Sequence, residues 1–190
     1  EGSGKPLEYA VKMRQLPQDA SLLHLLKENR IDGPAVNRLA RRLVDFYRRA
    51  ETGAHVNDLG SWETVRDNCE ENFTQMDAHA GENLDQRQYE IVRSATRAYL
   101  HRRSALFNQR VQSGKIRDCH GDLRSGHIYF DDGIQIIDCI EFNQRFRYAD
   151  ITSDLAFLVM DLDFEGYPKT ARQLVGEFVR TAADPDAYAL

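Results

Sequence analysis

Apolar side chains recur every three or four residues along most of the chain, which is the spacing of one face of an α-helix. In the clearest case the stripe consists of Val36, Leu39, Ala40, Leu43, Val44 and Tyr47. The pattern predicts helices over residues 19–28, 32–49, 61–76, 85–112, 151–160 and 170–182. A loop is expected at 53–60, between the second and third of these helices.

Two stretches depart from the helical period. Residues 7–17 alternate as a short strand does, and Pro17 ends that pattern. Farther along, two β-branched and aromatic runs flank Asp131-Asp132-Gly133, and an Asp-Gly turn in this setting predicts a β-hairpin. The fold class predicted is therefore α+β and mainly helical, with one hairpin set into a continuous helical body.

Composition is that of one globular domain. The chain has 190 residues, of which 42% are hydrophobic and 29% are charged. The net charge of −5 is spread along the chain, which argues against a nucleic-acid surface. No apolar run approaches the length of a membrane span, and the first residues do not form a signal peptide. Three cysteines without paired spacing favour a cytoplasmic location.

Candidate chemistry gathers around the predicted hairpin. Asp122 and His127 come before it, and Asp138 and Glu141 come after it. Because a hairpin brings its two ends together, these four side chains are expected to meet at one edge. Phosphoryl transfer needs a carboxylate near the acceptor hydroxyl and ligands for Mg²⁺, which prefers oxygen. The spacing therefore indicates a phosphoryl-transfer site.

The motifs also carry a family resemblance. The run HGDLRSGHIYF, followed by IQIIDCIEF, resembles the catalytic loop and metal-binding strand of aminoglycoside phosphotransferase-like kinases. The run RYADITSDLAFLVMDLD resembles the stretch that follows, in which Asp-Leu-Ala begins a buried helix. The chain is similar in particular to a bacterial branch that carries an additional ATP-binding domain. This resemblance implies the C-terminal lobe of a protein kinase-like fold.

The resemblance also implies roles for individual residues. Asp122 is implied as the catalytic base, Asp138 as a Mg²⁺ ligand, and Asp154 as a structural acid that braces the catalytic loop. The family pattern has Asn as the second metal ligand, whereas this chain has His127 there. An imidazole at that position either weakens the second metal or moves the preference toward Mn²⁺.

Several roles stay open on the sequence alone. Arg124 either reaches the γ-phosphate, whose charge suits a guanidinium, or forms a surface salt bridge. His127 either binds a metal or only hydrogen-bonds to Asp138 or to the loop backbone. His120 is expected to support the loop by hydrogen bonding. Glu141 is a candidate for indirect support of the metal through water.

Residues 7–17 are similar to the hinge strand of the same family. There the resemblance implies that backbone groups of Met13, Arg14 and Gln15 hold the adenine of ATP. No glycine-rich phosphate loop of either common pattern occurs in the chain. We therefore expect an N-terminal lobe upstream of residue 1, and the resemblance implies a further C-terminal ATP-binding domain in the same protein.

Together these readings predict ATP-dependent transfer of the γ-phosphate to a hydroxyl of a small molecule, with Mg²⁺ or Mn²⁺ as cofactor. Two alternatives remain: a nucleotide-binding regulator with impaired catalysis, and a metal-dependent phosphohydrolase. The second would use His120, Asp122, His127 and Asp138 as metal ligands. The acceptor is not specified by the sequence, although the acidic balance is compatible with a cationic compound such as an aminoglycoside.

Overall fold

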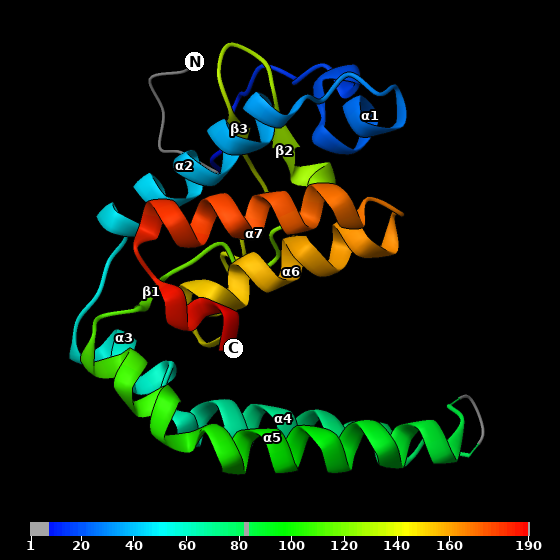
Figure 1. Ribbon diagram of the computed structural model, residues 1–190, viewed down its shortest axis with the longest axis vertical. Coiled ribbons are helices and arrows are strands. Elements are labelled where there is room, and N and C mark those ends of the chain that lie inside the picture. The colour runs from blue at the N-terminus through cyan, green and yellow to red at the C-terminus, as the bar shows by residue number, and fades with distance from the viewer. Residues whose placement is uncertain (1–7, 82–83, 190) are drawn as a thin grey trace.

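The computed structural model describes residues 8–81 and 84–189, which form a helical body and a projecting two-helix arm (Figure 1). The helices of the body are α1 (Leu22–Lys27), α2 (Gly33–Arg49), α6 (Ile151–Phe164) and α7 (Pro168–Ala182). The arm consists of α4 (Trp62–Asp77) and α5 (Gln86–Gln112), with the short α3 (Ala54–Leu59) at its base. The 3-10 turns are η1 (Gln18–Ala20), η2 (Ser125–His127), η3 (Gln144–Phe146) and η4 (Pro185–Ala189).

Helix α2 lies at the centre of the core. All six residues of its predicted stripe are buried, which confirms the amphipathic pattern. They share one hydrophobic cluster with Leu155 and Leu158 of α6 and with Leu174 and Phe178 of α7. The helix begins where the carboxylate of Asp32 accepts a hydrogen bond from the backbone N–H of Ala35 at 2.8 Å, a standard N-cap.

Two small antiparallel sheets position the loops of the body. Strand β1 (Ile116–Asp118) pairs with β4 (Tyr148–Asp150), and β2 (Ile128–Tyr129) pairs with β3 (Gln135–Ile136). The second pair lies where the Asp-Gly turn predicts a hairpin, and each of its strands has only two residues. Asp132 and Gly133 both have positive φ, as a tight turn between paired strands requires.

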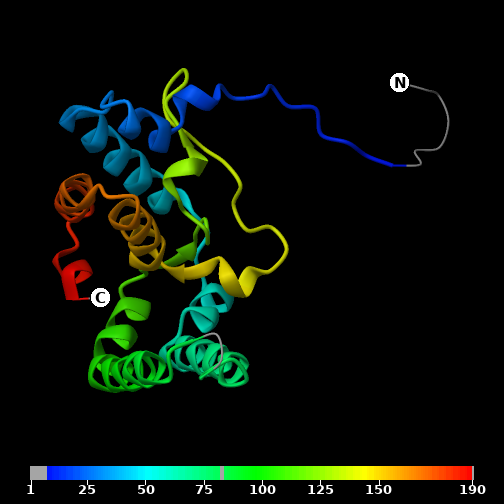
Figure 2. The ribbon, with the colours of Figure 1, turned by 90° about the vertical axis from the view of Figure 1, so that its right-hand side faces the viewer.

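The strand predicted at 7–17 is not formed by residues 8–17. This segment runs away from the body (Figure 2), and no strand among the described residues lies beside it. Tyr9, Val11 and Met13 are each more than 80% exposed, with values of 87%, 83% and 82%. The prediction is wrong here because an extended segment becomes a strand only when a neighbour accepts its backbone hydrogen bonds. Residue 7 lies outside the described ranges.

The predicted loop at 53–60 contains helix α3, so this prediction is also wrong. Val56 is fully buried and packs with Ile116 of β1 and Tyr148 of β4. A Cβ atom on Gly60 would lie 2.3 Å from Cγ2 of Ile116, so only glycine fits where the helix ends against the strand. A helix of six residues is too short for periodicity to reveal, and here tertiary packing stabilises it.

Three other boundaries differ from the prediction. The helix expected at 19–28 is divided into η1 and α1, because Ser21 is extended and caps α1 through its hydroxyl. Helix α6 continues past residue 160 to Phe164. Helix α7 begins at Pro168 rather than at residue 170, since proline fits the first helical turn.

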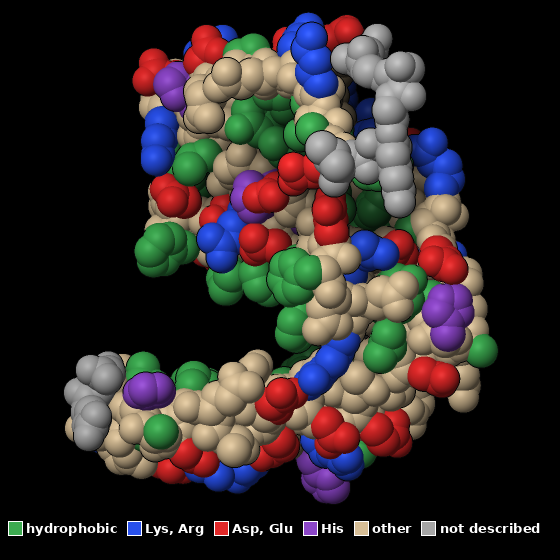
Figure 3. Space-filling model, turned by 180° about the vertical axis from the view of Figure 1, so that it is seen from behind, with side chains coloured by type: hydrophobic (Ala, Val, Ile, Leu, Met, Phe, Trp, Pro, Cys, Tyr) green, Lys and Arg blue, Asp and Glu red, His purple; other side chains and the backbone are tan. Residues whose placement is uncertain are grey.

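The arm stands apart from the body, and Figure 3 shows a deep gap between them. The apolar side chains of α5 are only partly covered. Tyr89 and Leu100 are buried, whereas Ile91 and Val92 are 58% and 57% exposed. Much of this helix is uncovered because α4, and not the whole body, packs along α5 (Figure 1). Within the described ranges, no helix is long and apolar enough to cross a membrane.

A buried ion cluster anchors the arm to the body; it consists of Arg110, Lys115, Asp150 and Asp184. The guanidinium of Arg110 contacts both oxygens of Asp150, at 2.5 and 2.7 Å, and Oδ1 of Asp184 at 2.8 Å. Lys115 Nζ lies 3.2 Å from Asp184. Burial alone would raise the pKa of Asp184, but the hydrogen bonds and charges of Arg110 and Lys115 hold it below its usual value. The cluster fixes the base of α5 at the start of α6.

Candidate active site

The loop that joins β1 to η2 is held by the carboxylate of Asp154, in the first turn of α6. Its oxygens accept hydrogen bonds from the backbone N–H groups of His120 at 2.7 Å and Gly121 at 2.8 Å. The hydroxyl of Tyr47 donates a third bond at 3.0 Å. Burial raises the pKa of Asp154, and the three hydrogen bonds oppose that rise. Asp154 therefore makes the contacts that a bracing acid requires.

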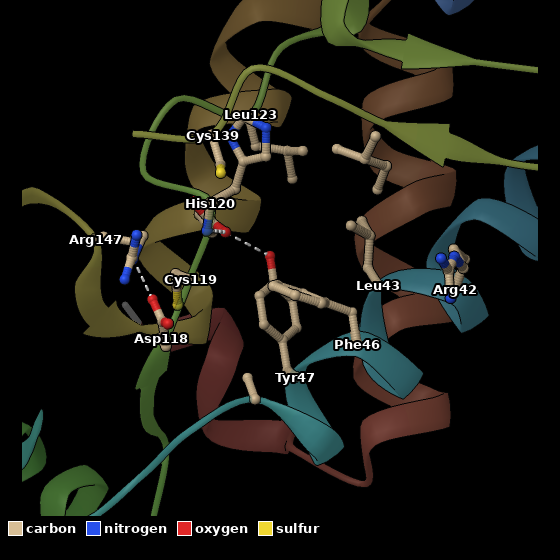
Figure 4. A pocket seen from close by; sticks show the side chains of 13 residues that line it. Arg42, Leu43, Phe46, Tyr47, Asp118, Cys119, His120, Leu123, Cys139 and Arg147 are labelled. Atoms are coloured by element: carbon tan, nitrogen blue, oxygen red, sulfur yellow. Dashed lines mark hydrogen bonds and ion pairs between the residues drawn. The ribbon is translucent and has the colours of Figure 1, made fainter. Parts of the chain in front are cut away.

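Two residues that the sequence analysis did not select also stabilise the loop. The apolar stripe of α2 predicts only a core position for Tyr47, and its hydroxyl also reaches Asp154 (Figure 4). Asp161 accepts bonds from the backbone N–H of Ser125 at 2.8 Å and from its hydroxyl at 2.5 Å. Asp154 and Asp161 are seven residues apart, so they share one face of α6. This seven-residue spacing would identify Asp161 if the predicted helix extended past residue 160, as α6 does.

Gly121 occupies a backbone conformation that other residues rarely adopt, with φ of +86°. A Cβ atom there would lie 2.8 Å from the backbone oxygen of Phe146 and 3.0 Å from Cδ1 of Ile140. The glycine thus lets the loop pass close to the chain that follows Asp138.

The first prediction concerns this close approach. Gly121→Ala should lower the free energy of unfolding by about 1–3 kcal/mol and reduce activity, because the methyl group meets backbone that cannot move away. Urea unfolding followed by circular dichroism measures the change. Gly126→Ala is the matched control, since no atom lies within 4 Å of a Cβ there. Equal stability of the two variants would show that the loop is not constrained at Gly121.

His120 uses both ring nitrogens to hold the loop. Nδ1 accepts a bond from the backbone N–H of Asp122 at 3.3 Å, and Nε2 lies 2.8 Å from the carbonyl oxygen of Ile137. Since an N–H can only donate and a carbonyl can only accept, the proton of the neutral ring is on Nε2. The backbone N–H of Ile140 also donates to the carbonyl of His120, at 3.0 Å. Both ring nitrogens of His120 therefore bond within the loop and to the chain after the hairpin.

His127 lies between Asp122 and Asp138. Its Nδ1 is 3.0 Å from the carbonyl oxygen of Asp122, and its Nε2 is 3.5 Å from Oδ2 of Asp138. A neutral ring that donates from Nδ1 presents the lone pair of Nε2 toward the carboxylate. Two electron-rich atoms that face each other at this distance are stabilised by a proton or a cation between them. Asp138 is largely exposed and has φ of +66°, which aspartate tolerates better than most residues.

The side chain of Asp122 is the most accessible acid on the loop itself. Oδ1 accepts a bond from Nε of Arg124 at 2.9 Å, and Oδ2 has no partner among the described residues. Both side chains are partly exposed. Of the two roles left open for Arg124, the structure contains the salt bridge. The backbone of Asp122 is fixed on both sides, by His120 and His127, so its carboxylate has a defined position.

Other residues selected from the sequence are not gathered at the site. Glu141 is exposed, and none of the described residues bonds to its carboxylate. Met13 and Gln15 are exposed, and nothing in the described part of the chain encloses them. Arg14 instead forms an ion pair with Asp131 in the hairpin turn.

Two cavities adjoin the loop. One of about 410 Å³ lies between the loop, β3 and the C-terminal half of α2, with walls that include Leu43, Phe46, Leu123, Ile136 and Cys139 (Figure 4). The other, of about 330 Å³, lies on the side of the arm, between Gly121, η3, α6 and α4. We call this second space the arm-side cavity. It opens beside the residue that precedes Asp122.

The donors at the site suit a cation that is also held by a substrate. Over residues 8–81 and 84–189, no group of three or more His, Cys, Asp and Glu side chains is placed to hold a metal. His127 and Asp138 supply one imidazole nitrogen and one carboxylate. Mg²⁺ commonly binds one or two carboxylates together with phosphate oxygens and water, so Asp138 is the ligand here that suits Mg²⁺, and the nitrogen of His127 suits softer divalent cations.

Comparison with known proteins adds independent information. A family model described as "Phosphotransferase enzyme family" matches residues 6–190. Curated relatives include the uncharacterized proteins Rv2004c of Mycobacterium tuberculosis and Mb2027c of Mycobacterium bovis, each 29% identical over 165 residues. The matched segment covers 86% of this chain and 33% of each relative, so the chain corresponds to about a third of their length. No solved structure matches the chain significantly.

Proposed function

Because the chain belongs to the phosphotransferase enzyme family, we propose that its loop and hairpin transfer the γ-phosphate of ATP to a hydroxyl of a small molecule. One observation carries this proposal: the accessible carboxylate of Asp122 lies on a braced loop, next to the paired side chains of His127 and Asp138. A base, a place for a cation and a fixed backbone are the components that phosphoryl transfer requires.

In the proposed reaction Asp122 acts on the acceptor. Its unpaired oxygen accepts a hydrogen bond from the acceptor hydroxyl and directs the hydroxyl oxygen toward the γ-phosphorus. As the new oxygen–phosphorus bond forms, the bond from the γ-phosphorus to the bridging oxygen breaks and ADP leaves. The hydroxyl proton passes to Asp122 late in the transfer and then to water. The products are ADP and a phosphate monoester of the acceptor.

Arg124 contributes a positive charge beside this carboxylate. Its guanidinium has one nitrogen bonded to Asp122 and is half exposed, which leaves its other donors available to a phosphate group. We propose that it contacts the transferred phosphoryl group while remaining near Asp122.

We propose that His127 and Asp138 hold one divalent cation together with oxygens of the nucleotide. The tautomer of His127 that donates to Asp122 supports this role, because it directs a lone pair toward Asp138. A bound cation would neutralise charge on the phosphates during transfer. Asp138 is the ligand suited to Mg²⁺, and His127 adds a ligand that Mn²⁺ accepts more readily.

A second prediction follows for the metal. In the full-length protein, His127→Asn should lower the ratio of activity with Mn²⁺ to activity with Mg²⁺, because an amide oxygen replaces an imidazole nitrogen. Activity is titrated against each metal, and Mn²⁺ binding is followed by electron paramagnetic resonance without turnover. His101→Asn, an exposed position on α5, is the control. If the activity ratio and Mn²⁺ binding were both unchanged, His127 would not be a metal ligand and would only form its bond with Asp122.

A complete ATP site needs contacts for the adenine and the phosphates besides those at the loop and hairpin. We propose that backbone groups of Met13, Arg14 and Gln15 hold the adenine, and that other parts of the full-length protein hold the phosphates and supply a further ATP-binding domain. Exposure of these three residues supports the first point, since nothing in the described part of the chain covers them. The greater length of the mycobacterial relatives is consistent with the second.

A regulator that binds nucleotide without transfer is the second candidate. His127 favours it, since this residue stands where the family pattern has asparagine. Absence of transfer in the presence of tight ATP binding would select it. The phosphohydrolase alternative lacks support, because both ring nitrogens of His120 are committed to the loop and cannot bind a metal.

A further inference from the structure

Two carboxylates of α6 hold the loop that joins β1 to η2, one near each end. Asp154 holds the start of the loop through the backbone N–H groups of His120 and Gly121. Asp161 holds its end through the backbone N–H and the hydroxyl of Ser125. Ser125 is fully buried, so these two donors cannot bond to bulk water, and leaving them unpaired would be costly. The bonds to Asp161 therefore decide where Ser125 lies.

The same bonds restrict the direction of Ser125. One oxygen of Asp161, Oδ2, accepts both of them, from the N–H at 2.8 Å and from the hydroxyl at 2.5 Å. Hydrogen bonds to an ionised carboxylate are shorter and stronger than those between neutral groups. Two such bonds between one pair of residues fix the backbone and the side chain of Ser125 together.

Ser125 is the first residue of η2, and His127 is the last. A 3-10 turn of three residues is too short to be stable by itself, so its orientation depends on what holds its ends. Its middle residue, Gly126, adds little support, since no atom lies within 4 Å of a Cβ at that position. At the far end, the carbonyl of His127 accepts a bond from the backbone N–H of Ile137 at 3.0 Å. The orientation of the turn therefore depends on Ser125 at one end and on Ile137 at the other.

The ring of His127 depends on this orientation because it makes two contacts at once. Its Nδ1 lies 3.0 Å from the carbonyl oxygen of Asp122, and its Nε2 lies 3.5 Å from Oδ2 of Asp138. A small rotation of η2 would turn Nε2 away from the carboxylate, and a cation between them would lose one of its protein ligands. Within the described ranges, the carboxylate of Asp161 bonds to Ser125 and to neither of these aspartates. Asp161 can therefore act on a cation through Ser125 and η2, without touching it.

We propose that Asp161 is a positioning residue of the cation site: by holding Ser125, it keeps the ring of His127 directed toward Asp138. This inference rests on the cation site of the proposed function and assigns part of its affinity to a residue outside the loop. Removing a group that orients a metal ligand typically changes metal affinity or activity by about 10- to 100-fold. The two carboxylates of α6 thus have different roles, since Asp154 braces the backbone next to the proposed base and Asp161 braces the turn that carries a metal ligand.

The test measures Mn²⁺ binding by electron paramagnetic resonance in the full-length protein with β,γ-methylene-ATP, an analogue whose γ-phosphate is not transferred. Asp161→Ala should weaken Mn²⁺ binding by about 10- to 100-fold. Ser125→Ala loses the hydroxyl bond but keeps the backbone bond, so it should weaken binding less. Because the two residues share one contact, the double variant should bind about as weakly as Asp161→Ala. The matched control is Asp163→Ala, at an exposed position on the same helix, which should bind as the wild type does.

A second readout follows the ring of His127 by ¹⁵N NMR at about pH 8, where an ordinary imidazole is neutral. It needs neither metal nor turnover. The wild type should show the proton on Nδ1, which donates to the carbonyl of Asp122, and Asp161→Ala should show both tautomers. A purely structural role would lower stability and leave this spectrum unchanged. If Asp161→Ala does not fold, Ser125→Ala provides the same two readouts.

Equal Mn²⁺ affinity in Asp161→Ala and Asp163→Ala would overturn the inference, and so would weaker affinity with an unchanged spectrum of His127. If the wild type bound no Mn²⁺, the cation site of the proposed function would be wrong, and the spectrum alone would decide the role of Asp161. Mixed tautomers in Asp161→Ala would then support the positioning of the ring, and a single Nδ1 tautomer would overturn it.

Discussion

Replacing Asp122 by asparagine should reduce phosphotransfer by about 10²- to 10⁴-fold in the full-length protein, while the fold and ATP binding change little. Asparagine preserves the shape of the side chain but cannot accept the acceptor proton. The backbone bonds that Asp122 makes with His120 and His127 do not involve its carboxylate, so they remain. Turnover is measured as ADP release, and ATP affinity is measured by calorimetry.

Asp132→Asn is the matched control for this experiment. Asp132 is exposed in the hairpin turn, and its φ of +49° is one that asparagine also accepts. This variant should have wild-type turnover. If Asp122→Asn also retained wild-type turnover, the assignment of the base would be wrong.

Arg110→Met should lower the free energy of unfolding by about 3–5 kcal/mol, the largest effect on stability expected from one substitution in this chain. The guanidinium is almost completely buried, with 2% of its side chain exposed, and it neutralises Asp150 and Asp184. Without it, the partly buried Asp150 has no cationic partner among the described residues, and Asp184 keeps only Lys115. Arg103→Met, at an exposed position on the same helix, should change stability by less than about 0.5 kcal/mol.

The same variant should alter the response to acid. The folded-state pKa of Asp184 lies below its ordinary value of 3.8, so its ionised form stabilises the fold. This contribution is complete above pH 3.8 and is lost as the pH falls through the lower folded-state pKa. Arg110→Met should therefore show a smaller loss of stability in that range than the wild type, as measured by urea unfolding at several pH values. An acid profile identical to that of the wild type would contradict this role for the cluster.

Local sequence signals located the centre of the candidate site but not everything that supports it. The Asp-Gly turn implied that Asp122, His127 and Asp138 would approach one another, and His127 does lie between the other two. The position of Asp154 followed from resemblance to a known loop. Asp161 was missed because its helix was expected to end one residue earlier. A local sequence pattern does not reveal that a residue near the end of a helix contacts a loop that is distant in the sequence.

Arrangements between distant elements were the least predictable. Arg110 was not selected from the sequence, because its partners are 40 and 74 residues away. Periodicity marks which face of α5 can be buried, but it does not specify what covers that face. The same limit explains the segment at 8–17, where an alternating pattern has no neighbouring strand among the described residues.

The proposed transfer is tested most directly by following its products with ³¹P NMR. Full-length wild-type protein and its Asp122→Asn variant are incubated with ATP, Mg²⁺ and an acceptor whose hydroxyl oxygen is ¹⁸O. We predict that the wild type forms ADP and an acceptor phosphate ester in equal amounts, with ¹⁸O retained in the ester bond, and that the variant forms almost none. Release of inorganic phosphate without ester, or ester formation at the same rate by the variant, would contradict phosphoryl transfer through Asp122.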